Sequence, residues 1–262
     1  MPRLEPGDED FAAPAGPVLQ QWEDGSRRVI ATGGVCSRGW WMEWDGLATF
    51  VFDQEGDVFV RAARPGMEPT VRHVFEKAVL PIVMVARGYE AFHASAVRVP
   101  SGVIGFLGLS GTGKSTTAEA LTRLGLDHYA DDTLVYRLVG DRPLAVRLNF
   151  PGAIPDAGRT DGTASASDDR SESLHRIYHL RRDPAQDPES PAFVQVPPAK
   201  RFDLLLTHAH PFDMGPPARR RAFITNVMTV ARVVDVWECH FAPDVESLPS
   251  LAGAIKRHAD AP

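Results

Sequence analysis

Short apolar runs separated by turn-forming residues fill the first part of the chain. From about Arg27 to Val60, β-branched and aromatic residues alternate with Asp-Gly and Gly-Asp turns, which is typical of an antiparallel meander. Between about residues 69 and 86, apolar residues recur at helical spacing. Pro81 lies inside this stretch and lacks a backbone N–H, so we expect a kink or a break there. The candidate strands are 28–31, 40–44, 47–52 and 58–60.

After residue 90 the pattern changes to alternating strands and helices, which is typical of an α/β fold. We therefore expect a flexible tail over residues 1–17, a β-rich region with a helix over 18–90, and one α/β domain over 91–262. Residues 155–173 are rich in Gly, Ser, Thr and Asp, which predicts a mobile loop. The expected elements are strands at 91–99, 103–107, 134–139 and 233–240, and helices at 116–124, 222–231 and 245–258.

Composition excludes several classes of protein. The formal net charge of -6 argues against a general nucleic-acid binder. Two cysteines are too few for a disulfide framework or a tetrahedral zinc site. No segment reaches the ~20 apolar residues that span a bilayer. The acidic N-terminus lacks the apolar core of a signal peptide, so the sequence predicts a cytoplasmic protein without nucleic-acid or membrane partners.

The segment Gly108–Ser115 matches the phosphate-binding pattern G-x-x-x-x-G-K-[ST] at every fixed position, between an apolar strand and a helix. In such a P-loop, glycines let the backbone N–H groups face the phosphates, and the helix N-terminus favours the negative charge. The pattern therefore predicts binding of ATP, with GTP left open, together with Mg²⁺. The expected nucleotide-binding residues are Gly108, Ser110, Gly111, Thr112, Gly113, Lys114, Ser115 and Thr116.

Two further features suggest chemistry next to this loop. Asp131 and Asp132 follow Lys114 by 17 and 18 residues (131 − 114 and 132 − 114), about the length that returns a chain to the sheet after one helix. One carboxylate can hold Mg²⁺ and the other can accept a proton, although an Asp pair also suits an ordinary turn. His93 precedes the loop in an apolar strand, where a histidine is more often a core residue than a catalyst.

Three motifs together resemble the bacterial HPr kinase/phosphorylase family, including its smaller relatives that phosphorylate lasso peptides. They are His93–Ala96, Gly105–Thr116 and Ala130–Asp132. The loop also resembles that of ATP-type phosphoenolpyruvate carboxykinase, which shares the nucleotide-binding fold. The resemblance implies a P-loop core of this type behind a small β-rich N-terminal region.

In that family the second Asp accepts the proton of a substrate serine, and the resemblance carries this role to Asp132. It likewise implies that His93 supports Asp132, that Lys114 binds phosphate, and that Ser115 and Asp131 hold the metal. The stretch 147–154 departs from the family because it contains no Glu, so we do not expect HPr itself to be the substrate. A homo-oligomer is compatible with the family, but the oligomeric state stays open.

The sequence thus predicts an ATP-dependent kinase that phosphorylates a serine of a peptide or small protein, such as a lasso-type precursor. The alternatives are a nucleotide-binding switch without kinase activity and a small-molecule kinase. Three further features are weaker. Arg219–Arg221 could clamp a phosphate but more often forms a solvated turn; His208 and His210 lack a clear third metal ligand; and Trp40–Trp44 favours packing over peptide binding.

Overall fold

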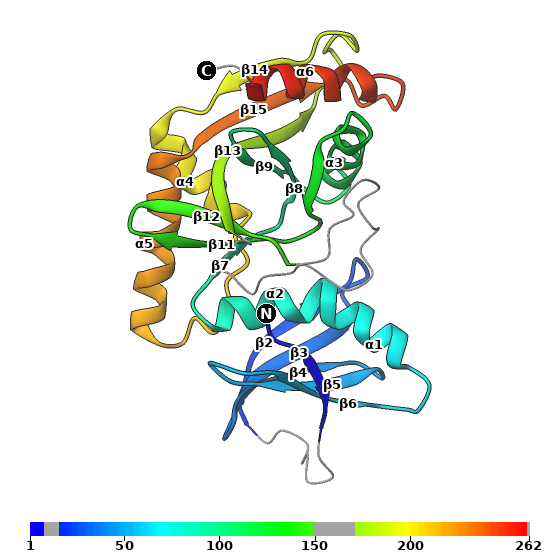
Figure 1. Ribbon diagram of the computed structural model, residues 1–262, viewed down its shortest axis with the longest axis vertical. Coiled ribbons are helices and arrows are strands. Elements are labelled where there is room, and N and C mark those ends of the chain that lie inside the picture. Colours follow the sequence, from blue (N-terminus) through cyan, green and yellow to red (C-terminus); the bar gives the residue numbers. More distant parts are fainter. Residues whose placement is uncertain (8–15, 149–170, 261–262) are drawn as a thin grey trace, which may run out of the picture. The chain divides into compact units, whose positions relative to one another are not determined.

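The computed structural model describes residues 1–7, 16–148 and 171–260 of the chain. The chain divides into two compact units (Figure 1). The first comprises Met1–Glu90 and Pro211–Ile224, and the second comprises Ala91–His210 and Thr225–Pro262. The change at residue 91 lies where the sequence pattern changes, whereas the sequence did not indicate that 211–224 belongs with the first unit.

The first unit contains a six-stranded sheet in the order β1-β6-β5-β4-β3-β2. The meander predicted from the alternating pattern is confirmed, because β3, β4, β5 and β6 pair antiparallel with their chain neighbours. Strand β1 instead pairs parallel with β6, so residues 4–6 correct the expectation of a loose tail. The bounds are β1 (Leu4–Pro6), β2 (Val18–Glu23), β3 (Val29–Cys36), β4 (Gly39–Trp44), β5 (Ala48–Phe52) and β6 (Val58–Ala62).

The predicted helix over 69–86 forms in three parts: α1 (Glu68–Val74), a π-helical turn η1 (Phe75–Val79) and α2 (Leu80–Ala86). Pro81 occupies the first turn of α2, where its missing N–H leaves no helical bond broken. The N–H of Leu80 bonds to the carbonyl of Phe75, the i→i−5 spacing of a π-turn. The expected irregularity at Pro81 is therefore a π-turn directly before it.

Segment 211–224 joins the first unit through an aromatic contact and a hydrogen bond. Phe212 is fully buried and stacks on Trp22 at 6.1 Å between ring centroids. The indole Nε1 of Trp40 donates to Asp213 Oδ2 at 2.9 Å, while its ring stacks on Phe52. These contacts support the packing role that the sequence favoured for Trp40.

A buried ion pair also lies in this unit. Arg219 reaches both carboxylate oxygens of Glu90, with Nη1–Oε1 at 2.6 Å and Nη2–Oε2 at 2.8 Å. The side chain of Glu90 is 2% exposed and that of Arg219 is 15% exposed. Arg220 donates to the carbonyls of Met214 and Gly215. Arg219 therefore neither clamps a phosphate nor lies in a solvated turn, because its guanidinium binds the Glu90 carboxylate.

The second unit is built on a nine-stranded sheet whose central strand is β13 (Ser171–Arg182). Strand β13 pairs parallel with both β9 (Gly102–Leu107) and β15 (Asp235–Phe241). Three parallel strands therefore end at the same edge, where the segment Gly108–Ser115 begins. The other strands are β7 (Glu90–Phe92), β8 (Ser95–Val99), β10 (Asp127–Ala130), β11 (Leu134–Val139), β12 (Arg142–Val146) and β14 (Ala192–Gln195).

The strand predicted over 91–99 is interrupted, and the interruption bears on the site. Strand β7 ends at Phe92 and β8 begins at Ser95. Between them, the N–H of His93 donates to the carbonyl of His208 and the N–H of Ala94 donates to the carbonyl of Asp132. These long-range partners replace regular strand pairing at His93 and Ala94.

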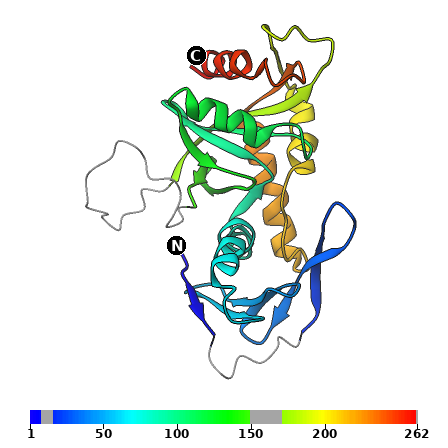
Figure 2. The same cartoon turned by 90° about the vertical axis from the view of Figure 1, so that its right-hand side faces the viewer.

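Helices α3 (Lys114–Arg123) and α6 (Leu248–Asp260) pack against one face of this sheet (Figure 2). Their buried side chains meet those of β8, β9, β13 and β15 in one cluster that includes Phe106, Leu121, Tyr178 and Ile255. The remaining helices are α4 (Pro198–Thr207) and α5 (Pro217–Val233). Within the described part of the chain, no helix is both long and apolar enough to cross a membrane.

The mobile loop predicted over 155–173 lies largely outside the described residues. Its last three residues, 171–173, instead form the start of β13, which pairs antiparallel with β12 at this end. Residues 202–206 form part of helix α4. The neighbouring strand β12 decides the element at 171–173, because this short stretch has no distinctive period of its own.

We expect Arg219→Met to destabilise the protein by about 3–5 kcal/mol, because it leaves the buried Glu90 carboxylate without its cation. Urea unfolding followed by circular dichroism measures this loss. Arg232→Met is the matched control: the Arg232–Asp141 ion pair has a similar distance, 2.8 Å, but exposed side chains. The control should lose less than about 1 kcal/mol. Equal losses in the two variants would contradict the assignment.

Candidate functional site

The segment predicted to bind phosphate connects the buried strand β9 to helix α3. Gly111 and Gly113 have φ angles of 76° and 108°, in the left-handed region that glycine adopts without steric cost. Gly113 is the N-cap of α3, and no side chain in the described part of the chain caps this first turn. The turn therefore presents backbone N–H groups and the positive end of the helix dipole, a suitable arrangement for an anion.

The Lys114 side chain folds back into this loop. Lys114 is 7% exposed, and its Nζ donates to the carbonyls of Gly108 at 3.0 Å and Leu109 at 3.3 Å. Burial lowers the pKa of the Lys114 ammonium, while the carboxylate of Asp132 acts in the opposite direction. The loop thus holds one largely buried cation, with an acidic side chain close enough to influence its charge.

The acid pair follows strand β10, which pairs antiparallel with β8. This pairing brings Asp131 and Asp132 beside residues 93–95. Asp132 has a φ of 66°, which is uncommon for a non-glycine residue. Its carbonyl accepts the N–H of Ala94 at 3.2 Å, and this bond helps to hold the left-handed conformation.

His93 is directed at Asp132. Its Nδ1 lies 3.0 Å from the backbone oxygen of Asp132 and 3.3 Å from the carboxylate Oδ1. Both of these atoms are acceptors, so Nδ1 must carry the proton. His93 therefore donates a hydrogen bond that orients the acidic residue. The Asp132 side chain is 65% exposed, so its carboxylate remains accessible.

A buried serine links the two predicted metal ligands. Ser95 is fully buried, and its Oγ lies 3.2 Å from Ser115 Oγ and 3.3 Å from Asp131 Oδ1. A hydroxyl and a carboxylate are oxygen donors that Mg²⁺ accepts, usually together with phosphate oxygens. Among the described residues, no group of three or more His, Cys, Asp or Glu side chains could hold a metal alone. Ser115 and Asp131 thus fit a metal that is shared with a bound nucleotide.

Histidines that the sequence treated as weak metal candidates lie beside His93 and Lys114. The ring of His210 stacks on that of His93 at 5.4 Å, and the ring of His208 lies 5.2 Å from that of His179. Burial, together with the charges of His179, Lys114 and His93, lowers the pKa of His208 to about 4. Burial also lowers the pKa values of His210 and His179. The positive charge of Lys114 contributes to the lowered pKa of both His208 and His210, so these two imidazoles lie within its electrostatic reach.

Sequence reasoning missed two residues of this region. Ser95 was part of a recognised motif but had no assigned role. Arg182, at the end of β13, donates from Nε to the carbonyl of Thr112 at 3.2 Å and places a second cation against the loop. The order of strands is what brings Arg182 there, since β13 lies next to β9 although more than sixty residues separate them. A basic residue at the end of an apolar run was the only signal in the sequence.

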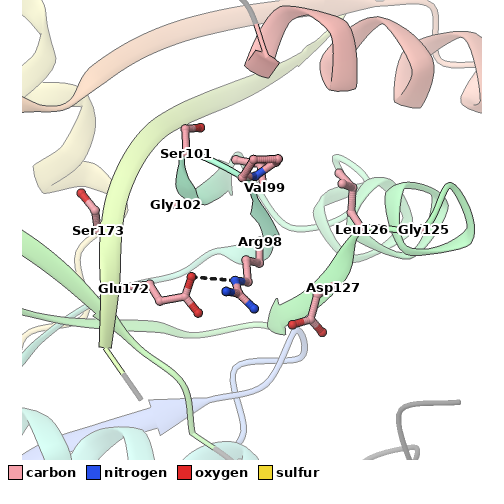
Figure 3. Close-up of a pocket in the computed structure, with 10 residues that line it drawn as sticks. Arg98, Val99, Ser101, Gly102, Gly125, Leu126, Asp127, Glu172 and Ser173 are labelled. Carbon is pink, nitrogen blue, oxygen red and sulfur yellow. Dashed lines mark ion pairs between the residues drawn. The ribbon is translucent and has the colours of Figure 1, made fainter. Parts of the chain in front are cut away.

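A cavity of roughly 460 Å³ lies at the other end of β9. It is lined by residues around Gly102, the first residue of β9 (Figure 3). The glycine-rich loop Gly108–Ser115 follows the last residue of that strand, Leu107. Arg98 and Glu172 face each other across it and form an ion pair at 2.8 Å. A third charged residue of the lining, Asp127, is paired with Arg147 at 2.6 Å.

Comparison with solved structures finds chains of similar fold. The sequence matches no family model and no curated protein. The fold is similar to the HPr(Ser) kinase/phosphatase from Coxiella burnetii, at 14% identity and a TM-score of 0.35. The similarity covers 64% of this chain and 95% of that one. We therefore base the function proposed below on the geometry of the described residues.

Stability should fall as the pH drops below about 6.5. The folded-state pKa of His208, about 4, is lower than the ordinary 6.5, so the unfolded chain binds more protons between these values. This contribution is complete above pH 6.5 and is lost as the pH falls toward 4. His208 alone should cost about 2 kcal/mol at pH 5. Urea unfolding at pH 7.5 and pH 5 measures the difference.

The variant His208→Gln should lose less stability than the wild type between those two pH values. His73→Gln, which changes an exposed histidine of α1, is the control for removing one titratable group. An unchanged pH dependence in His208→Gln would show that His208 is not the group responsible.

Proposed function

We propose that this protein is an ATP-dependent kinase that transfers the γ-phosphoryl group to a serine hydroxyl of a peptide or small protein. The observation that supports it most is the arrangement around Asp132. Hydrogen bonds from the N–H of Ala94 and the Nδ1–H of His93 to its backbone oxygen hold this acidic residue, which acts electrostatically on Lys114 of the glycine-rich loop. A base held beside a phosphate cradle is the combination that phosphoryl transfer to a hydroxyl requires.

In this proposal the loop Gly108–Gly113 and the first turn of α3 bind the triphosphate, and Lys114 exchanges its bonds to loop carbonyls for bonds to phosphate oxygens. Ser115 and Asp131 would hold Mg²⁺, which supplies positive charge to the phosphates. Arg182 adds a further cation at the edge of the loop.

Asp132 accepts the hydrogen bond of the serine hydroxyl and takes its proton as the reaction proceeds. The serine oxygen forms a bond to the γ-phosphorus while the bond from that phosphorus to the bridging oxygen of ADP breaks. The proton then leaves Asp132 for solvent. His93 keeps its Nδ1–H on Asp132 throughout, so the carboxylate does not have to be oriented when the substrate arrives.

The exposure of Asp132 favours a macromolecular acceptor. Its side chain is 65% exposed, whereas a small molecule is normally bound in a pocket that covers most of its surface. A serine on an extended peptide can reach an open carboxylate.

Loss of the loop lysine should abolish tight nucleotide binding. Lys114→Met removes charge-assisted hydrogen bonds to phosphate, so we expect ATP affinity to fall by about 10- to 100-fold. Titration calorimetry with ATP and Mg²⁺ measures the change, and the same titration with GTP tests the choice of base. Lys200→Met, at an exposed position of α4, is the control and should bind as the wild type does. Unchanged affinity in Lys114→Met would refute the phosphate site.

Asp132→Asn separates chemistry from binding. It should keep ATP affinity within about threefold while phosphate transfer falls by about 10²–10⁴-fold, the usual contribution of a general base. The assay follows label from γ-³²P-ATP into an array of serine peptides, each with a matched Ser→Ala peptide. Asp203→Asn, on the exposed side of α4, is the control.

A wild-type protein that binds ATP but labels no peptide would count against the kinase. If nucleotide then changes its affinity for a partner, and Asp132→Asn keeps that response, the protein is a switch. Undiminished transfer by Asp132→Asn would remove the proposed base.

A further inference from the structure

The segment that follows α4 runs beside β7 and brings two histidines to the candidate site. The carbonyl of His208 accepts the N–H of His93 at 2.8 Å, and the N–H of His210 donates to the carbonyl of Ala91 at 2.9 Å. Phe92 and Ala209 form an antiparallel bridge between these two bonds. Residues 91–93 and 208–210 are therefore fixed to each other by their backbones, whatever their side chains do.

This bridge places the His210 ring on the face of His93. The ring centroids are 5.4 Å apart and the planes differ by 16°, an offset stacked arrangement. The edge of His93 is held separately, through Nδ1, by the backbone oxygen and the carboxylate of Asp132. One contact thus fixes the plane of the His93 ring and the other fixes its rotation within that plane.

We propose that His210 is a positioning residue, whose ring holds His93 with its Nδ1–H directed at Asp132. This role rests on the proposed function only where it concerns catalysis. His210 itself does not reach Asp132 through a hydrogen bond in the described structure; it acts through His93. A histidine that can turn freely about its side-chain bonds would spend part of its time with Asp132 unsupported.

The electrostatic environment of His210 is compatible with this role. Burial lowers the pKa of His210, the positive charge of Lys114 acts in the same direction, and Asp132 opposes it. A neutral imidazole face stabilises a neighbouring ring and tolerates a positive charge on it, whereas a second cation would repel it. His210 is therefore suited to remain a neutral support while His93 donates to the acid.

Two matched variants of His210 separate the effect of its aromatic ring from the effect of its side-chain volume. His210→Leu keeps similar volume but has no aromatic face, while His210→Phe keeps the face and loses the ring nitrogens. The first readout is the tautomer of His93, from long-range ¹H–¹⁵N spectra of the full chain labelled with ¹⁵N-histidine. The His93 signals are assigned by their loss in His93→Gln.

In the wild type and in His210→Phe, His93 should be in the Nδ1–H tautomer, as its two acceptors require. In His210→Leu it should exchange between both tautomers. His240→Ala is the control, because the His240 ring contacts Glu238 rather than His93, and it should leave the His93 signals unchanged. A wild-type His93 tautomer in His210→Leu would overturn the proposal. If His210→Leu does not fold, His210→Ala takes its place.

The second readout is catalysis. His210→Leu should lower kcat for peptide phosphorylation about 10-fold, with the KM for ATP changed less than twofold, and His210→Phe should restore kcat to within twofold. Equal kcat values for Leu and Phe variants would overturn the catalytic role even if the tautomer changes. If no form of the protein transfers phosphate, the kinase proposal fails, whereas the spectra still decide whether His210 fixes His93.

Discussion

The backbone oxygen of Asp132 accepts two hydrogen bonds, one from the N–H of Ala94 and one from Nδ1 of His93. These bonds hold Asp132 in a left-handed conformation that few residues other than glycine adopt. They also explain the gap between β7 and β8, since residues 93 and 94 bond to distant partners rather than to a strand. The position of the acidic side chain beside the glycine-rich loop depends on this interaction.

Around His93 and Asp132, the sheet of the second unit supplies the rest of the site. Parallel pairing of β9, β13 and β15 brings the ends of three strands to one edge, as open α/β sheets do at their ligand sites. Lys114 comes from the helix after β9, and Arg182 from the end of β13. Ser95, from β8, joins Ser115 to Asp131. The site is a set of cations, oxygen donors and one oriented acid, which is the chemistry of phosphate rather than of a deep apolar pocket.

Much of the architecture could be predicted because its signals are local. Alternating residues with Gly-containing turns specified the meander β3–β6, and the change to alternating strands and helices after residue 90 indicated the α/β unit that contains α3, α5 and α6. Short stretches without a clear period were the ones misjudged. Strand β1 forms only because β6 offers it a parallel partner, and residues 171–173 become strand because β12 lies beside them. Segment 211–224 belongs with the first unit because Phe212, Asp213 and Arg219 find partners there.

By itself, the sequence determined the strand, glycine-rich loop and helix that contain Lys114 and Ser115, because glycine conformation and helix initiation depend on neighbouring residues. It also determined that two acids and a histidine occur at suitable spacings. Only the tertiary structure decided that His93 donates to Asp132, that Ser95 lies between Ser115 and Asp131, and that His210 stacks on His93. The reason is physical: spacing along a chain does not reveal strand order or register, and these contacts join residues that only the sheet and its bridge to 208–210 bring together.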